Sequence, residues 1–191
     1  GYKGELYPPG FTGGFFGRKW SLYEGGIRMP FIMRWDSKIP KSSMDSTSIV
    51  TAMDLFPSIC SLIGIEYPKN LDGIDKSKSF LGVPIVNKFP VMWEYSSNPG
   101  GSIKPSGSWN IGGSLKPKNR SFHSPNLAIR NGDWKLLINT DLTGEMLYNL
   151  NNDPGEKINL ADTEQEIVKE LKDKVIEWRK SMPVEIPKNI Q

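Results

Sequence analysis

A pair of adjacent glycines, Gly25-Gly26, constrains this chain more than any other feature. Glycine adopts positive φ angles freely and allows a close approach of backbone, so two in succession mark a specific bend. The bend lies between a charged loop, which contains Lys19 and Glu24, and an apolar run at residues 27–35. Loops fixed at the ends of regular elements often carry binding groups, because the scaffold positions them. The sequence therefore predicts a functional loop that leads into a strand.

The apolar run at residues 27–35 predicts a strand buried on both faces, because its hydrophobic side chains are nearly continuous. Arg28 interrupts the run, and a buried arginine requires a partner. Glu24, four residues earlier, is the nearest candidate. Structural roles are therefore predicted for both Glu24 and Arg28.

A helix is predicted at residues 55–63, capped by Asp54 and ended by Gly64. It contains Cys60, the only cysteine, which we interpret as a buried core residue because a free cysteine behaves as a small hydrophobe. One cysteine excludes an internal disulfide framework. No run of oxygen ligands typical of a calcium loop is present, so no metal ligand is predicted in this sequence.

The second half of the chain predicts an antiparallel sheet followed by a helix. Asn131-Gly132-Asp133 favours a tight hairpin turn. The predicted strands are residues 91–95, 127–130, 134–138 and 145–150. Thr163 and Glu166 predict a capping box that opens a helix at residues 163–181. This helix is expected to bury Ile167, Leu171, Val175 and Trp178.

A change of composition near residue 88 predicts two domains, 1–87 and 88–191. Within the second, residues 96–124 form a Gly/Ser/Pro/Asn-rich insertion far longer than ordinary connections, and such segments are usually functional or disordered. It contains Trp109 and His123, the only histidine, which are candidate substrate-binding residues. The alternative is that the histidine is a surface or structural residue.

Composition excludes several classes of function. The net charge is +3 and the pI is near 8.9, and the sequence lacks the dense basic stripe of a nucleic-acid-binding protein. No apolar run approaches the roughly 20 residues of a membrane span. The N-terminus has no signal-peptide layout, but a segment of a longer protein would lack it in any case, so export is not excluded. The 37% of hydrophobic and 24% of charged residues describe a soluble globular chain, and its mildly basic charge would suit an anionic partner.

The spacing of Lys19, Glu24-Gly25-Gly26, Arg28 and Pro30 resembles the second signature of the sulfatase family, of the arylsulfatase or N-acetylgalactosamine-6-sulfatase type. Four further blocks are similar to the family and occur in its order. They are residues 53–65, 71–74, 128–137 and 147–161. The resemblance covers nearly the whole chain and is to the C-terminal part of the family.

The resemblance implies an α/β fold: residues 1–87 as the end of an alkaline-phosphatase-like domain, and residues 88–191 as a small subdomain with a four-stranded antiparallel sheet and a packed C-terminal helix. It implies hydrolysis of sulfate monoesters, of aryl sulfates or sulfated carbohydrates, by a formylglycine- and calcium-dependent mechanism. It gives Lys19 a catalytic role, binding the sulfate group and the formylglycine hydroxyl. It also implies an exported protein, periplasmic, secreted or lysosomal.

The family's nucleophile motif, Cys or Ser followed by x-Pro-Ser-Arg, and its calcium ligands do not occur in this sequence. We therefore expect a missing N-terminal part of the same protein as partner, and a segment that is inactive alone. Two alternatives remain open. One is a phosphodiesterase or phosphonate hydrolase of the same superfamily, and the other is a non-catalytic module that binds sulfated glycans.

Overall fold

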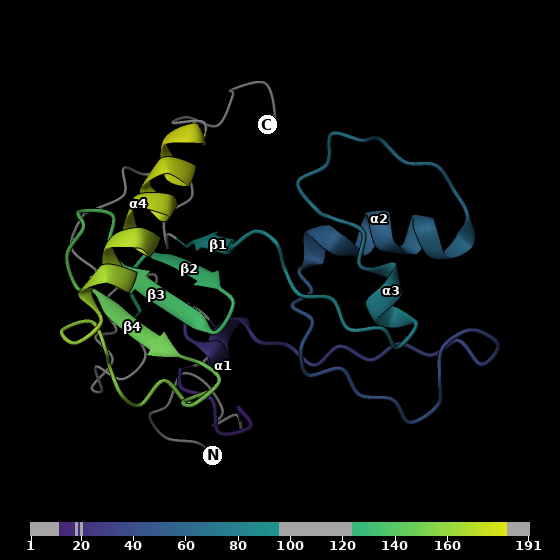
Figure 1. Ribbon diagram of the computed structural model, residues 1–191, viewed down its shortest axis with the longest axis horizontal. Coiled ribbons are helices and arrows are strands. Elements are labelled where there is room, and N and C mark those ends of the chain that lie inside the picture. The colour runs from purple at the N-terminus through teal and green to yellow at the C-terminus, as the bar shows by residue number, and fades with distance from the viewer. Residues whose placement is uncertain (1–11, 18, 20, 96–123, 183–191) are drawn as a thin grey trace, which may run out of the picture. The chain divides into compact units, whose positions relative to one another are not determined.

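Four short strands form one antiparallel sheet in the order β1-β2-β3-β4 (Figure 1). The computed structural model describes residues 12–17, 19, 21–95 and 124–182. The strands are β1 (Val91–Glu94), β2 (Leu127–Asn131), β3 (Trp134–Ile138) and β4 (Met146–Asn149). The predicted antiparallel sheet is confirmed, and each strand ends within one residue of its expected bound.

The hairpin between β2 and β3 is tighter than predicted. Asn131 pairs with Trp134, so it belongs to the ladder and leaves only Gly132 and Asp133 in the turn. Gly132 adopts a φ of +60°, a conformation that glycine accepts without a steric penalty. The Asn-Gly signal therefore identified the hairpin correctly, although the turn begins one residue later.

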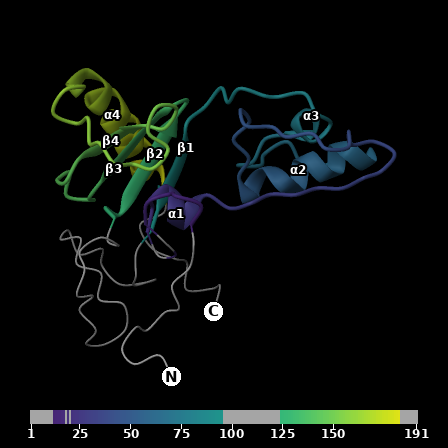
Figure 2. The same ribbon diagram turned by 90° about the horizontal axis from the view of Figure 1, so that it is seen from below.

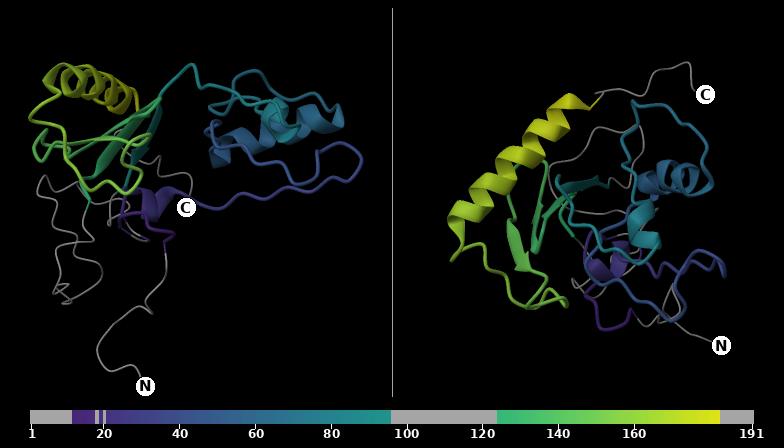
Figure 3. Two further views of the ribbon diagram at one scale, coloured as in Figure 1. Left: turned by 60° about the horizontal axis from the view of Figure 1, so that its bottom comes forward. Right: turned by 45° about the vertical axis from the view of Figure 1, so that its right-hand side comes forward.

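The two faces of the sheet are covered by different parts of the chain. One face packs against α4 (Gln165–Ser181), whereas the other packs against Leu22 and Tyr23, next to α1 (Glu24–Ile27). The left panel of Figure 3 and Figure 2 show α4 and α1 on opposite sides of the sheet. Successive strand residues point to opposite faces, which is why neighbouring residues belong to different clusters. The face under α4 contains Leu127, Ile129, Leu136, Ile138 and Leu147, and the opposite face Ala128, Leu137 and Tyr148.

The predicted C-terminal helix is confirmed, but its capping box is wrong. Glu164 takes the N-cap position without a side-chain bond, and the Thr163 hydroxyl instead donates to the Leu160 carbonyl at 3.1 Å. A threonine hydroxyl has several local acceptors, and here a preceding turn provides the nearer one. The buried positions are Val168, Leu171 and Val175, while the predicted Ile167 and Trp178 are only partly buried and pack against this cluster.

The predicted strand at residues 27–35 is wrong. The chain forms α1 up to Ile27 and then continues outside the sheet, with Met29 77% and Ile32 91% exposed. Arg28 is also not buried, since its side chain is 46% exposed. Apolar content indicated burial, but a strand also needs a neighbour to accept its backbone hydrogen bonds. In the part of the chain that the structure describes, the four strands pair only with one another.

Residues Met29–Phe89 form a second compact unit that contains α2 (Ala52–Ile63) and α3 (Ser77–Phe80). The predicted cap of α2 is wrong in position: Thr51 precedes the helix, and Asp54 accepts hydrogen bonds from the Thr51 backbone N–H at 2.8 Å and hydroxyl at 2.9 Å. The helix therefore begins three residues earlier than expected. Gly64 ends it with a φ of +74°, as predicted.

The first compact unit combines the described residues up to Arg28 with those from Pro90 onward. The junction at Phe89–Pro90 lies near the expected boundary at residue 88, but the segment before Arg28 groups with the sheet. The reason is that Leu22 and Tyr23 complete the core on the second face of the sheet. The division into domains 1–87 and 88–191 stays a prediction about the whole protein.

Candidate functional site

Lys19 is exposed and lies in a turn. Gly17 has a φ of +78°, and a Cβ atom at this position would lie 2.6 Å from the Ser21 hydroxyl and 2.7 Å from the Tyr23 Cβ atom. Only glycine fits such a crowded left-handed position. The sequence at this point therefore fixes the path of the backbone that carries the exposed lysine.

Gly25 closes the same loop from its other end. Its N–H donates to the Phe16 carbonyl at 2.7 Å, which joins the two ends of the Lys19 segment. A Cβ atom on Gly25 would lie 2.6 Å from the carbonyl oxygens of both Phe16 and Gly17. The next glycine, Gly26, donates its N–H to the Tyr23 carbonyl at 2.8 Å within the first turn of α1. The predicted requirement for close backbone approach is therefore met at Gly25.

Glu24 lies between these features and is buried in an ionic cluster. Its carboxylate accepts a hydrogen bond from Lys135 Nζ at 2.9 Å, and the same ammonium donates to Glu156 Oε1 at 2.8 Å. The other Glu156 oxygen accepts the Glu24 backbone N–H at 2.7 Å. Glu24, Lys135 and Glu156 are all nearly or fully excluded from solvent. We call these three residues the buried ionic cluster.

Two arginines stand at the rim of the cluster. Arg28 Nη1 lies 3.7 Å and Arg130 Nη1 3.9 Å from Glu24 Oε2. The predicted pairing of Arg28 with Glu24 therefore forms, although Lys135 makes the closer contact. The Arg28 guanidinium also lies over the Phe15 ring, 4.5 Å from its centroid. These cations balance the second carboxylate, which a buried site requires.

Burial dominates the electrostatics of the site. Desolvation raises the pKa of Glu156 in spite of the opposing effect of Lys135. Burial, together with the nearby Glu156 charge, raises the pKa of Tyr23 to about 12. The Tyr23 hydroxyl donates to the Met146 sulfur at 3.2 Å, and its ring meets Phe16 edge-on with centroids 4.6 Å apart. Tyr23 therefore anchors the loop as a neutral, packed side chain.

The arrangement separates two tasks. Lys19 is an exposed residue, and a lysine ammonium can hold an oxyanion. Exposure alone does not test the catalytic role expected for Lys19, so that role stays a prediction. Both carboxylates bind Lys135, and Glu24 also faces the rim arginines, so the cluster holds the backbone and leaves little capacity for a metal ion. Among the described residues, no group of three or more His, Cys, Asp or Glu side chains is placed to bind a metal.

Of the predicted motif residues, Gly25 binds the Phe16 carbonyl ahead of Lys19, and Arg28 pairs with Glu24. Trp109 and His123 lie outside the described residues, so their predicted substrate contacts stay predictions. Sequence reasoning missed Lys135, a charged residue inside the apolar strand β3, and Glu156, which follows the Asp153-Pro154-Gly155 turn. A lysine in the middle of an apolar strand was the available signal.

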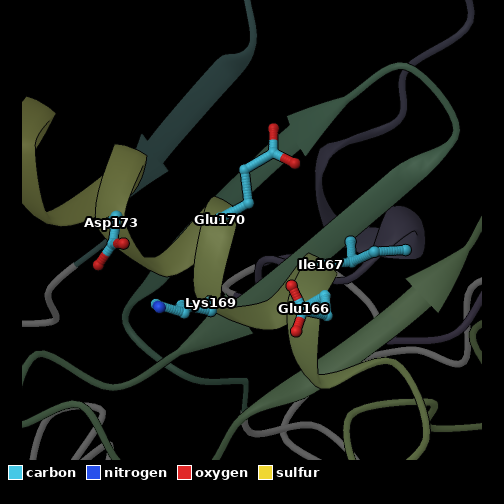
Figure 4. Close-up of a pocket in the computed structure, with 5 residues that line it drawn as sticks. All are labelled: Glu166, Ile167, Lys169, Glu170 and Asp173. Atoms are coloured by element: carbon cyan, nitrogen blue, oxygen red, sulfur yellow. The ribbon is translucent and has the colours of Figure 1, made fainter.

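A surface hollow lies along α4, but its side chains do not form a binding site. Figure 4 shows the residues that line it, which all come from successive turns of this one helix: Glu166, Ile167, Lys169, Glu170 and Asp173. They do not converge on a common point. Mixed charges spaced along a solvated helix face are ordinary surface.

Two smaller predictions concern the rest of the chain. Cys60 is a free, buried cysteine, as predicted for a core residue. The described helices include none that is both long and apolar enough to cross a membrane.

Comparison with known proteins places this chain beside one class of enzyme. The family described as N-sulphoglucosamine sulphohydrolase, C-terminal, matches residues 12–94. N-acetylgalactosamine-6-O-sulfatase of Bacteroides thetaiotaomicron is 27% identical over 158 residues, which cover 81% of this chain and 28% of that protein. Arylsulfatase A of Bos taurus is 29% identical over 162 residues, covering 80% and 30%. The chain therefore spans less than a third of the length of these relatives.

Solved structures show a similar fold. One, from a description of the metabolism of multiple glycosaminoglycans by Bacteroides thetaiotaomicron, superposes with a TM-score of 0.61 at 23% identity, covering 88% of this chain and 32% of that one. The structure of Ps i-CgsB with k-i-k-neocarrahexaose gives a TM-score of 0.60 at 22% identity, covering 83% and 30%. At this identity the likeness establishes the fold, with its sheet and C-terminal helix.

Proposed function

The chain is related to the C-terminal parts of sulfatases, and we propose that it completes the active site of a sulfatase that hydrolyses sulfate monoesters. The observation that carries the proposal is the exposed Lys19 on a loop whose two ends are joined by the Gly25–Phe16 hydrogen bond. An amine presented on a preorganised backbone is suited to hold an oxyanion, because little reorganisation is needed when the anion binds.

The substrate proposed is a sulfated carbohydrate or an aryl sulfate. Relatives are named for sulfated N-acetylgalactosamine and for aryl sulfates, which supports this class. In the proposal, the Lys19 ammonium holds sulfate oxygens and offsets the negative charge that redistributes as the S–O bond breaks. The buried ionic cluster does not meet the substrate but supports the loop. Residues 96–124, with Trp109 and His123, are proposed to select among substrates.

The remaining machinery is proposed to come from a preceding part of the same protein. A formylglycine nucleophile and a calcium ion are parts of this proposal, and the described residues here do not build a site for that ion. An exposed apolar face supports a covering partner: α2 presents Met53, Phe56, Ile59 and Ile63 to solvent, all at least 43% exposed. Export of the whole protein, to the periplasm, a lysosome or the medium, belongs to the same proposal.

Turnover by the full-length protein tests the function. We expect hydrolysis of an aryl sulfate and release of sulfate from a sulfated oligosaccharide, and no turnover by residues 1–191 alone. Faster hydrolysis of a phosphate diester or phosphonate ester would instead favour the phosphate-cleaving alternative. Binding of sulfated glycans without turnover by the full-length protein would favour a non-catalytic module.

A further inference from the structure

We propose that Lys135 and Glu156 are positioning residues for the Lys19 loop, the segment whose ends are joined by the hydrogen bond between Gly25 and Phe16. They act through Glu24, which holds the backbone of this loop. This inference rests on the proposed sulfatase function. It assigns a purpose to a buried, charged group that the proposed chemistry does not otherwise use. It also connects one loop to two segments more than 100 residues later in the chain.

Glu24 is fixed at two separate points. Its side chain accepts from Lys135 Nζ at 2.9 Å, and its backbone N–H donates to Glu156 Oε2 at 2.7 Å. Lys135 Nζ also binds Glu156 Oε1 at 2.8 Å, so the two anchors hold each other. Holding both a side chain and the peptide group of one residue fixes its position and its orientation.

The position of Glu24 is passed directly to the lysine loop. The next residue, Gly25, donates its N–H to the Phe16 carbonyl, just before the turn that carries Lys19. On the other side of the loop, the Leu22 N–H donates to the Ser124 hydroxyl at 2.7 Å. A displacement of Glu24 therefore moves the closing point of the loop, whereas the contact with Ser124 restrains the chain at Leu22.

The cluster supports this loop more than it supports the sheet. Lys135 points to the face of the sheet opposite α4, whereas Leu136 and Ile138 beside it form a separate core with the helix. Loss of the Lys135 ammonium would bring two buried carboxylates together without their shared cation. We expect the Glu24 segment to move outward to reduce this repulsion, because the sheet keeps its own apolar core. The loop should therefore loosen before the sheet does.

Amide hydrogen exchange and steady-state kinetics on the full-length protein test this inference. The variants are Lys135→Met, which keeps the length of the side chain, and Glu156→Gln, which keeps an oxygen acceptor for the Glu24 N–H. Lys172→Met is the matched control, since Lys172 pairs with Glu145 at 2.6 Å in a partly exposed position on α4. Exchange is followed at residues 21–27 and, as an internal reference, in β2 and β3.

In Lys135→Met we expect exchange at residues 21–27 to accelerate at least about tenfold more than exchange in β2 and β3. Turnover of an aryl sulfate should fall by up to about 10²-fold, mainly in kcat, because displacement by about 1 Å is enough for such a loss. Glu156→Gln should show smaller effects of the same kind, and Lys172→Met neither.

Each other outcome has a definite meaning. Equal acceleration in the loop and the strands, or none in either, would overturn the inference and leave the cluster a general stabiliser. A loosened loop with unchanged kcat would also overturn it, since positioning would then not matter for the reaction. If the wild-type protein turns over no sulfate ester but the loop loosens selectively, the proposed function fails while the assignment of the cluster to this loop stands.

Discussion

Lys135 Nζ lies 2.9 Å from Glu24 Oε1, although 111 residues separate the two in sequence. Glu24 begins α1 and Lys135 lies inside strand β3, and both side chains are buried. Glu156 completes the arrangement from a turn near the C-terminal helix. Three motifs that are separate in sequence therefore meet at one buried ammonium, and one of them, Glu24, precedes the glycine whose N–H binds the Phe16 carbonyl before Lys19.

The effect of Glu24→Gln on the free energy of unfolding should change sign when Lys135 is also replaced. Lys135→Met should lower the free energy of unfolding by about 3 kcal/mol or more, because it leaves buried carboxylates without their cation. Adding Glu24→Gln should then restore part of this loss, although Glu24→Gln alone destabilises the wild type. A coupling energy of about 1–3 kcal/mol is expected from denaturant unfolding of the four proteins. Strictly additive losses would contradict a direct ionic contact.

Gly25→Ala should destabilise the protein and displace the loop. The new Cβ atom would meet two carbonyl oxygens at 2.6 Å, and backbone cannot yield as a flexible side chain does. A loss of about 2–3 kcal/mol is expected. Gly64→Ala is the control, because Gly64 has a positive φ but open space around it, so only about 1 kcal/mol of backbone strain applies. Thermal unfolding of both variants measures the difference, and equal losses would show that the close approach at Gly25 is unimportant.

The stability of the protein should depend on pH through Glu156. Burial raises the pKa of this carboxyl, so the folded state holds its proton more tightly than the unfolded state does. Its contribution is therefore fully present below about pH 4.3, the ordinary pKa of a glutamate, and is lost as pH rises through the folded value. Lys135 and Glu24 face the group and act on it in opposite directions.

Glu156→Gln should remove this dependence. The unfolding free energy of the wild type, minus that of the variant, should decrease as pH rises above about 4.3, the ordinary pKa of a glutamate. Carboxyls elsewhere with lowered pKa values, such as Asp45 and Asp141, occur in both proteins and cancel in the difference. A difference that stays constant or increases with pH would contradict the raised pKa of Glu156.

The insertion at residues 96–124 should affect selectivity more than catalytic power. Replacing residues 98–121 by a short Gly/Ser linker in the full-length protein should change the ratio of activity on a sulfated glycan to activity on a small aryl sulfate. Single variants His123→Ala and Trp109→Ala should shift the same ratio in the same direction. Kinetics on the two substrates decide the point, and an equal loss on both would remove the insertion from substrate choice.

The sheet and α4 were predictable because their signals are local: Asn131-Gly132 for the hairpin, and apolar spacing for the helix. The strand predicted at residues 27–35 failed because hydrophobicity reports burial in some assembly but not the presence of a pairing partner. The Lys19 loop was found from its glycines. Lys135 and Glu156 were not, since an ion pair between distant segments leaves no periodic pattern in sequence.

The effect of Lys19→Ala on kcat in the full-length protein tests the central claim most directly. Removing one preorganised group that stabilises developing charge typically lowers turnover by about 10²–10³-fold, or roughly 3–4 kcal/mol. The unfolding midpoint should stay unchanged because the side chain is exposed. Lys19→Arg should recover only part of the activity, since a planar guanidinium does not reproduce a compact ammonium. A kcat near that of the wild type in Lys19→Ala, or a loss matched by unfolding, would contradict the account.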